Sequence, residues 1–397
     1  MYEYVKDFQN MGFGMFVHFG LYSVIGEGEW VKHIARIPYE KYDKNIAKFK
    51  VKKTWAKELV KMAKNAGCKY ITLTTRHHDG FSLYDTRGLN DYDVIHSPTG
   101  RDLVREFVDE CNAQGIVPFF YHTILDWHNN DYKEDFPKYI DYLIKSVEIL
   151  CTQYGKIGGL WFDGYWDKPD ADWQFDRLYA MIRKHQPTAM IINNTGMGAR
   201  GEVGHPEIDS VTYERGKPSK EVDNADRPRA SEMCEVFNSH WGFAKMDISY
   251  KPVSEILNSL VTCRSYNCNF LLNVGPLANG DIRTIDRGYM EEIGKWIKFN
   301  KNFIYTSRMC DITAENAVML KGEDCYYAIV KAGMVADINV AINDPTSNVK
   351  INGVKIKRAT WLDNGKRIKI KNKNEFTTEP FFYGTSMVYR VAKIVLE

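Results

Sequence analysis

Residues 158–164, Gly-Gly-Leu-Trp-Phe-Asp-Gly, form a short apolar run that ends in a single acidic residue. A run of this kind is typical of a buried β-strand, so it predicts Asp163 at the end of a strand in a parallel sheet. Barrel enzymes carry their reactive groups at such strand ends. Trp161 adds a flat apolar ring beside the carboxylate, and the two together suit the binding of a sugar.

Seven similar runs occur before residue 305, and amphipathic segments lie between several of them. The eight predicted strands are 14–20, 70–78, 116–122, 158–164, 189–194, 208–214, 231–237 and 269–275. The predicted helices are 55–65, 101–114, 136–154, 173–185, 253–264 and 285–300. This alternation predicts an α/β fold, a (β/α)8-like (TIM) barrel over residues 1–305, with no helical pattern after the fifth and sixth strands.

The pattern changes after residue 305, where short alternating segments replace the helical period. Segments such as 325–332, 336–342, 348–356 and 386–397 alternate apolar and polar residues. Alternation with a period of two is typical of half-buried strands. Residues 306–397 are therefore predicted to form a small β-sandwich domain.

The composition restricts the class of ligand. Lys and Arg number 53 against 51 for Asp and Glu, so the formal net charge is only +2. This balance predicts neither nucleic acid nor a membrane as partner. Aromatic residues make up 13% of the chain, which favours a carbohydrate ligand because sugar faces stack on flat rings.

The eight cysteines show no paired spacing, so neither a metal site nor a redox motif is expected. The first 20 residues do not resemble a secretory leader, and a cytoplasmic location is predicted. His77 and His78 are adjacent, and neighbouring strand residues point to opposite faces, so they do not form the H-x-H pair of a metal-dependent barrel hydrolase. No metal and no cofactor are expected.

Polar side chains recur where the predicted strands end. They are His18, His77, His78, Tyr121, Asp163, Asn193, Asn194, Glu214, Glu232 and Asn273. A ring of polar groups at one face of a barrel indicates a site more than a requirement of folding. Retaining glycoside hydrolysis needs two carboxyl groups. Asp163 is the first candidate, and Glu207, Glu214, Glu232 and Glu235 remain open as the second.

Seven short motifs occur in an order that resembles one enzyme family. They are FGMFVHFGLYS (13–23), GEWV (28–31), HHDGF (77–81), FYHTILDW (120–127), LWFDG (160–164), SEMC with SHWGF (231–243) and NFLLNVGP (269–276). Together they resemble family 29 glycoside hydrolases, the retaining α-L-fucosidases. The resemblance implies a barrel followed by a β-sandwich, and a fucosylated oligosaccharide or glycoside as substrate.

The resemblance also implies roles for single residues. Asp163 corresponds to the nucleophile and Glu232 to the acid/base. The residues that correspond to fucose-binding side chains, or that are expected to line the site, are His18, Glu29, Trp30, His77, His78, Tyr121, Trp161 and Trp241. Ser231 replaces the usual Trp before the acid/base, so Glu214 remains an alternative. Arg215, Arg227 and Arg229 are all candidates for the family's fucose-contacting arginine.

Two other functions fit parts of the pattern. A non-catalytic fucose-binding barrel would use the same aromatic and histidine side chains, and the pair Asp163 and Glu232 disfavours it. A metal-dependent barrel hydrolase is disfavoured because no H-x-H motif occurs.

Overall fold

A computed structural model describes residues 2–220, 222, 226–335, 341–342 and 348–397. The chain divides into two compact units, one of Met1–Lys251 with Asn269–Glu291 and one of Pro252–Cys268 with Glu292–Glu397. These bounds differ from the single boundary after residue 305, and that division of the chain stays a prediction. Within the described ranges, no helix is both long and apolar enough to cross a membrane.

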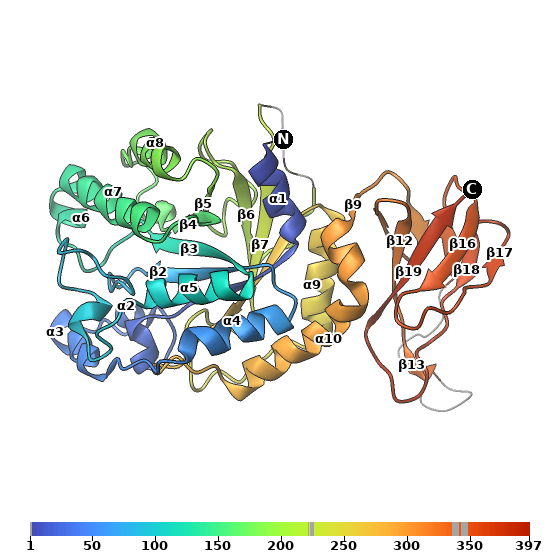
Figure 1. Cartoon of the computed structure of the whole chain (residues 1–397), viewed down its shortest axis with the longest axis horizontal. Helices are drawn as coiled ribbons and strands as arrows, with labels where there is room; N and C mark the ends of the chain where they lie inside the picture. Colours follow the sequence, from blue (N-terminus) through green and yellow to red (C-terminus); the bar gives the residue numbers. More distant parts are fainter. Residues whose placement is uncertain (1, 221, 223–225, 336–340, 343–347) are drawn as a thin grey trace. The chain divides into compact units, whose positions relative to one another are not determined.

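Eight parallel strands close into a barrel in chain order, with β8 pairing to β1 (Figure 1). The strands are β1 (Phe13–Val17), β2 (Tyr70–Arg76), β3 (Val117–Thr123), β4 (Gly159–Asp163), β5 (Met190–Asn193), β6 (Ser210–Glu214), β7 (Ala230–Val236) and β8 (Asn269–Val274). Each overlaps its predicted apolar run, and almost every strand residue is buried. The predicted barrel is confirmed.

Figure 1 shows α4, α5, α7 and α8 on the outer side of the barrel strands. The helices are α1 (Glu3–Met11), α2 (Val31–Ile34), α3 (Tyr39–Tyr42), α4 (Trp55–Asn65), α5 (Leu103–Gln114), α6 (Asp131–Glu134), α7 (Phe136–Gln153), α8 (Phe175–His185), α9 (Val253–Ser265) and α10 (Thr284–Thr306). All six predicted helices are present. In the described part of the chain, no helix joins β5 to β6 or β6 to β7, as the sequence predicts.

Helix α1, which the sequence analysis missed, packs against the end of the barrel where the strands begin. Val5 and Phe8 are buried in the same apolar cluster as Tyr70 and Phe119. Asn269, the first residue of β8, donates its side-chain amide to the carbonyl of Phe8. This packing closes the barrel opposite the strand ends that carry polar residues.

The second unit contains two antiparallel sheets that pack face to face. One has the order β16-β19-β12-β11-β9 and the other β10-β15-β18-β17, and a two-stranded sheet pairs β13 with β14. Side chains of both larger sheets share one apolar core, including Trp361, Phe376 and Ile394. This arrangement confirms the predicted β-sandwich. Residues 336–340 of the predicted strand at 336–342 lie outside the described residues.

The sandwich strands are short. They are β9 (Arg308–Met309), β10 (Ala314–Glu315), β11 (Val318–Lys321), β12 (Tyr326–Lys331), β13 (Met334–Val335), β14 (Ala341–Ile342), β15 (Asn348–Ile351), β16 (Ile356–Trp361), β17 (Ile370–Lys371), β18 (Glu375–Thr377) and β19 (Tyr389–Leu396).

Candidate active site

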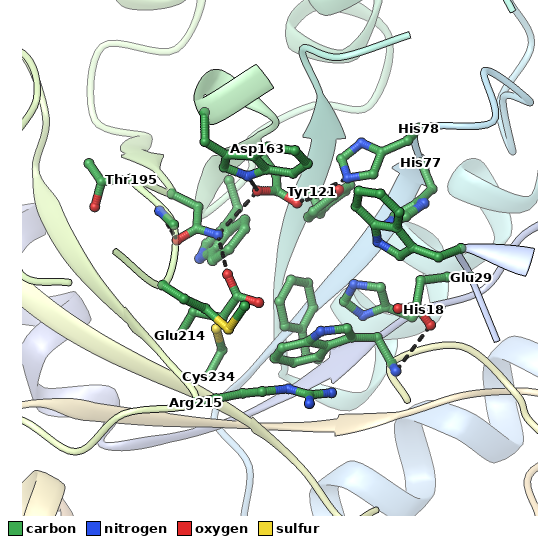
Figure 2. A pocket seen from close by; sticks show the side chains of 18 of the residues that line it. His18, Glu29, His77, His78, Tyr121, Asp163, Thr195, Glu214, Arg215 and Cys234 are labelled. Atoms are coloured by element: carbon green, nitrogen blue, oxygen red, sulfur yellow. Dashed lines mark hydrogen bonds and ion pairs between the residues drawn. The ribbon is translucent and has the colours of Figure 1, made fainter. Parts of the chain in front are cut away.

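A cavity of about 650 Å³ opens at the carboxyl ends of the barrel strands. Figure 2 shows Asp163 between Glu214 on one side and the two histidines His77 and His78 on the other. All eight residues predicted to bind substrate line this cavity: His18, Glu29, Trp30, His77, His78, Tyr121, Trp161 and Trp241. Asp163 and the alternative acid Glu214 line it too, whereas Glu232 does not.

Asp163 is the last residue of β4, and its carboxylate accepts hydrogen bonds from three side chains. Tyr121 donates to Oδ2 at 2.9 Å, while Asn194 and Trp166 donate to Oδ1 at 3.1 and 3.3 Å. The chain turns away directly after Asp163 because Gly164 has a φ of 103°. A Cβ at Gly164 would lie 2.5 Å from Cβ of Leu125, so only glycine fits there.

Asn194 lies between Asp163 and Glu214 and donates to both carboxyl groups from one nitrogen. Its Nδ2 is 3.1 Å from Asp163 Oδ1 and 2.8 Å from Glu214 Oε2. The hydroxyl of Thr212 donates to Asn194 Oδ1 at 2.9 Å, which directs the amide nitrogen toward the two acids. The two carboxyl oxygens are therefore at most about 6 Å apart, below the range of about 6.5–9.5 Å of inverting glycosidases.

Glu214 is the last residue of β6 and has the properties of a proton donor. Burial raises the pKa of its carboxyl group to about 7, and the negative charge of Asp163 acts in the same direction. The hydrogen bond from Asn194 and the charges of Arg215 and Arg200 oppose this increase. An acid with a pKa near 7 can release and recover a proton near neutral pH.

Glu232 lies deeper in the barrel than the cavity. In the register of β6 and β7, Glu214 pairs with Cys234, which lines the cavity, while Glu232 pairs with Thr212. Glu232 is two residues before Cys234, so it lies about 7 Å deeper in the barrel than Cys234 and Glu214. Its side chain is only 1% exposed and accepts hydrogen bonds from Trp161 Nε1 at 2.9 Å and from the hydroxyl of Tyr70.

The two other candidate acids also lie away from the cavity. Glu207 is half exposed and lies 3.6 Å from Arg183, and Glu235 forms an ion pair of 3.3 Å with Lys251. Of the glutamates considered for the second carboxyl group, Glu214 is the one that lines the cavity.

His18 has a defined proton position, which follows from its partners. Asn273 donates its amide to the carbonyl of Trp241 at 2.7 Å, so its Oδ1, 2.7 Å from His18 Nδ1, accepts a proton from that nitrogen. Burial lowers the pKa of His18 to about 3. The ring is therefore neutral at physiological pH, and Nε2 can accept a hydrogen bond from a ligand hydroxyl.

The same reasoning assigns the proton of His78. Thr123 donates its hydroxyl to the carbonyl of Leu125 at 2.5 Å, so it accepts from His78 Nδ1 at 2.7 Å. His78 Nε2 then lies 3.5 Å from Asp163 Oδ2 as a lone-pair acceptor. Burial lowers the pKa of His78, and the charge of Asp163 opposes the decrease. His77 lies flat against the ring of Tyr121, with centroids 5.6 Å apart.

Glu29 and Trp30 also line the cavity, and the ring of Trp30 lies 5.5 Å from that of His78. Glu29 Oε2 accepts from the backbone N–H groups of Trp241 and Gly242 at 3.1 and 2.8 Å. Burial raises the pKa of Glu29, and the Gly242 hydrogen bond opposes that increase. The ring of Trp30 stacks on Trp166, with centroids 5.7 Å apart.

Arg215 is the one of the three candidate arginines that lines the cavity. Its Nη2 donates to the carbonyl of Ser239 at 2.7 Å, and its guanidinium lies 5.2 Å from the ring centroid of Trp241. Arg227 and Arg229 instead hold the loop before β7. Arg227 pairs with Asp209 at 2.5 Å, and Arg229 pairs with Asp226.

Several lining residues were missed by the sequence analysis. They include Phe16, Trp166, Met197 and Ser239. Trp166 lies in the loop three residues after Asp163, and its exposed fraction is 36%. A loop residue has no periodic pattern that would indicate whether it faces a cavity. In the described part of the chain, no cluster of three His, Cys, Asp or Glu side chains could hold a metal ion.

Comparison with known proteins gives one consistent family. Residues 2–302 match the family model described as Alpha-L-fucosidase. The mouse tissue alpha-L-fucosidase is 27% identical over 339 residues, covering 78% of this chain and 73% of that protein.

Solved structures match the whole chain. Alpha-L-fucosidase isoenzyme 1 from Paenibacillus thiaminolyticus is 32% identical, with a TM-score of 0.85 over 100% of this chain and 99% of that one. A GH29 alpha-L-fucosidase from Bacteroides thetaiotaomicron, trapped as a covalent intermediate with 2-fluoro-fucosyl fluoride in a glutamate-to-glutamine variant, is 25% identical, with a TM-score of 0.84 over 100% and 97%. The chain belongs to the alpha-L-fucosidase family, glycoside hydrolase family 29.

Proposed function

We propose that this protein hydrolyses terminal α-L-fucosyl residues of fucosylated oligosaccharides or glycosides with retention, using Asp163 as nucleophile and Glu214 as acid/base. The observation that carries this proposal is the single nitrogen of Asn194 that bonds both carboxyl groups. It holds them at a separation compatible with the spacing of about 5–5.5 Å in retaining glycosidases. Glu214 thus replaces Glu232, the acid/base implied by the resemblance.

In the first step, Asp163 attacks the anomeric carbon while protonated Glu214 donates its proton to the glycosidic oxygen. The bond between the anomeric carbon and that oxygen breaks, the aglycone leaves as an alcohol, and a β-linked fucosyl ester forms on Asp163. Three donors, Tyr121, Asn194 and Trp166, stabilise the carboxylate of Asp163 and fix its direction.

In the second step, Glu214, now ionised, accepts a proton from a water molecule as that water attacks the anomeric carbon. The ester bond to Asp163 breaks, and fucose leaves with its original α-configuration. The raised pKa of Glu214 supports both roles, because the group must be an acid first and a base afterwards.

The remaining side chains fit the recognition of a neutral deoxysugar. His18 and His78 offer acceptors for hydroxyl groups, and the buried carboxyl group of Glu29 adds a further polar contact. Trp161 and Trp241 supply apolar surface against which a ring or a methyl group can pack.

Azide rescue tests the choice of acid/base. We would assay Glu214→Ala, Glu232→Ala and, as a matched control, Glu207→Ala, with an aryl α-L-fucoside and sodium azide. Azide needs no base, so it attacks the fucosyl ester only when the true acid/base is missing, and the product is α-fucosyl azide. We expect this product from Glu214→Ala alone. Its formation by Glu232→Ala and not by Glu214→Ala would contradict the proposal.

The wild-type enzyme distinguishes catalysis from binding alone. A fucose-binding barrel without activity would bind fucose yet release no aglycone from the aryl fucoside. We expect release by the wild type, and loss of it in Asp163→Asn with fucose binding retained.

We also propose that the protein works in a reducing compartment such as the cytoplasm. All eight cysteines belong to the described residues and are free thiols, seven of them buried. Free buried thiols are typical of reducing compartments. Cell fractionation tests this, and recovery of the protein outside the cell would contradict it.

A further inference from the structure

Glu232 is a buried acid for which the proposed reaction has no direct use. It lies on β7 inside the barrel and is held by side chains of two other strands, Tyr70 on β2 and Trp161 on β4. Its neighbours Tyr70, Trp161, Ala230 and Cys234 belong to the apolar core of the barrel. Burying a carboxyl group lowers the stability of a fold unless hydrogen bonds compensate for the lost hydration, and Glu232 accepts two such bonds.

The indole of Trp161 connects Glu232 to the cavity. Trp161 Nε1 donates to Glu232 Oε1 at 2.9 Å, and this is the only N–H that an indole can offer. The same ring is 2% exposed, lines the cavity and stacks on Tyr121, with centroids 5.6 Å apart and planes 21° apart. The hydroxyl of Tyr121 in turn donates to Asp163 Oδ2 at 2.9 Å.

Strand geometry makes this connection direct. Trp161 and Asp163 are two residues apart on β4, so both side chains point to the same face. Tyr121 is the register partner of Trp161 on β3. A change in the tilt of the indole would therefore displace both the surface on which a sugar ring rests and the phenol that orients the nucleophile.

Tyr70 prevents the carboxyl group of Glu232 from rotating. Its hydroxyl bonds Oε2, which leaves Oε1 for Trp161. The ring of Tyr70 reaches this position because Gly14 on β1 has no side chain, and a Cβ there would lie 2.6 Å from Cε1 of the ring. Three strands thus contribute to the orientation of one carboxyl group.

We propose that Glu232 is a positioning residue, whose carboxyl group fixes the indole of Trp161 and, through the stacked ring of Tyr121, the carboxylate of Asp163. The inference rests on the proposed fucosidase activity. Glu232 itself transfers no proton to the substrate.

The variants Glu232→Gln and Glu232→Met test the inference with an aryl α-L-fucoside. The glutamine amide can still accept from Trp161 and donate to Tyr70, so we expect kcat within about threefold of the wild type. Methionine offers no comparable acceptor, and we expect kcat to fall about 10- to 100-fold. Neither variant should yield α-fucosyl azide, and the alkaline limb of the pH profile should stay where it is in the wild type.

A double-mutant cycle tests whether Glu232 acts through Trp161. Trp161→Phe removes the same hydrogen bond from the other side, so Glu232→Met combined with Trp161→Phe should be no slower than the slower single variant. Thr72→Val is the matched control, because Thr72 lies on β2 two residues after Tyr70 and its buried hydroxyl has no hydrogen-bond partner among the described residues. We expect Thr72→Val to leave kcat unchanged.

Three results would overturn the inference. They are wild-type kcat in a folded Glu232→Met variant, multiplicative losses in the double variant, and restored turnover with azide. If Glu232→Met does not fold, Glu232→Gln serves as the test. A loss of kcat in Glu232→Gln as large as that in Trp161→Phe would contradict the inference, because the glutamine side chain still accepts the hydrogen bond of the indole. An inactive wild type would instead reject the proposed function.

Discussion

Asp163 and Glu214 share one hydrogen-bond donor, the side-chain nitrogen of Asn194, at 3.1 and 2.8 Å. Two carboxyl groups this close do not both ionise readily, and the one that accepts fewer hydrogen bonds keeps its proton. Asp163 accepts three hydrogen bonds from side chains, whereas Glu214 accepts the one from Asn194. This difference leaves the shared proton on Glu214, whose pKa is raised to about 7.

The activity should therefore decrease in alkaline solution. Glu214 must be protonated in the first step, and its pKa is about 7, so kcat/KM should fall as the pH rises through 7. Below that pH the group is in its active form. Initial rates between pH 4 and 9, measured with a fucoside whose leaving group is an alcohol, define this alkaline limb of the pH–rate profile. In Glu214→Gln the limb should be absent, and its persistence in that variant would assign it to another group.

Asn194→Ala should move the same limb to higher pH. The hydrogen bond from Asn194 lowers the pKa of Glu214, so its loss raises that pKa and keeps the acid protonated to a higher pH. The nucleophile also loses a donor, and we expect kcat to fall about 10- to 100-fold. A pH–rate profile of the variant measures both effects. A limb that moves toward lower pH would contradict the shared-donor geometry.

His18 should remain neutral throughout the working range. Burial lowers its pKa to about 3, and Asn273 fixes the proton on Nδ1. In ¹⁵N-labelled enzyme, the imidazole shifts of His18 should stay constant between pH 5 and 8 and indicate the Nδ1–H form. His18→Ala identifies the resonance. Titration of His18 near the ordinary pKa of about 6.5 would contradict the burial of its ring.

Gly14→Ala should destabilise the barrel. The added Cβ would overlap the ring of Tyr70, which cannot move without losing its bond to Glu232. We expect a loss of about 1–3 kcal/mol in the free energy of unfolding, as in other overpacked cores. Urea unfolding of the variant and of Gly288→Ala measures this, because a Cβ at Gly288 meets no atom within 4 Å. Equal stability of the two variants would contradict the packing.

Much of the barrel could be predicted because each strand is a short apolar run bounded by polar residues. The sandwich could be predicted from a different pattern, the alternation of apolar and polar residues in its strands. Helix α1 was missed because it is short, and only two of its nine residues, Val5 and Phe8, are buried. The position of α1 at the end of the barrel depends on contacts with residues far away in the sequence, such as Tyr70 and Asn269.

The site could be predicted only in part. His18, Tyr121 and Asp163 lie at or near the ends of apolar runs, so the strands themselves predict that these residues lie near the carboxyl ends of the barrel. The choice between Glu214 and Glu232 could not be made, because both lie in apolar strands, and depth in the barrel depends on the register of β6 against β7. Trp166 and Met197 belong to loops, where no periodic pattern indicates which side chains face a cavity.

Mass spectrometry of a trapped enzyme identifies the nucleophile directly. We would incubate Glu214→Gln with 2-fluoro-fucosyl fluoride, because fluoride leaves without a proton donor and the variant lacks the base that activates water. We expect one 2-fluorofucosyl group per chain, attached to the peptide that contains Asp163. A label on any other carboxyl group, Glu232 included, or complete turnover without a label would contradict it.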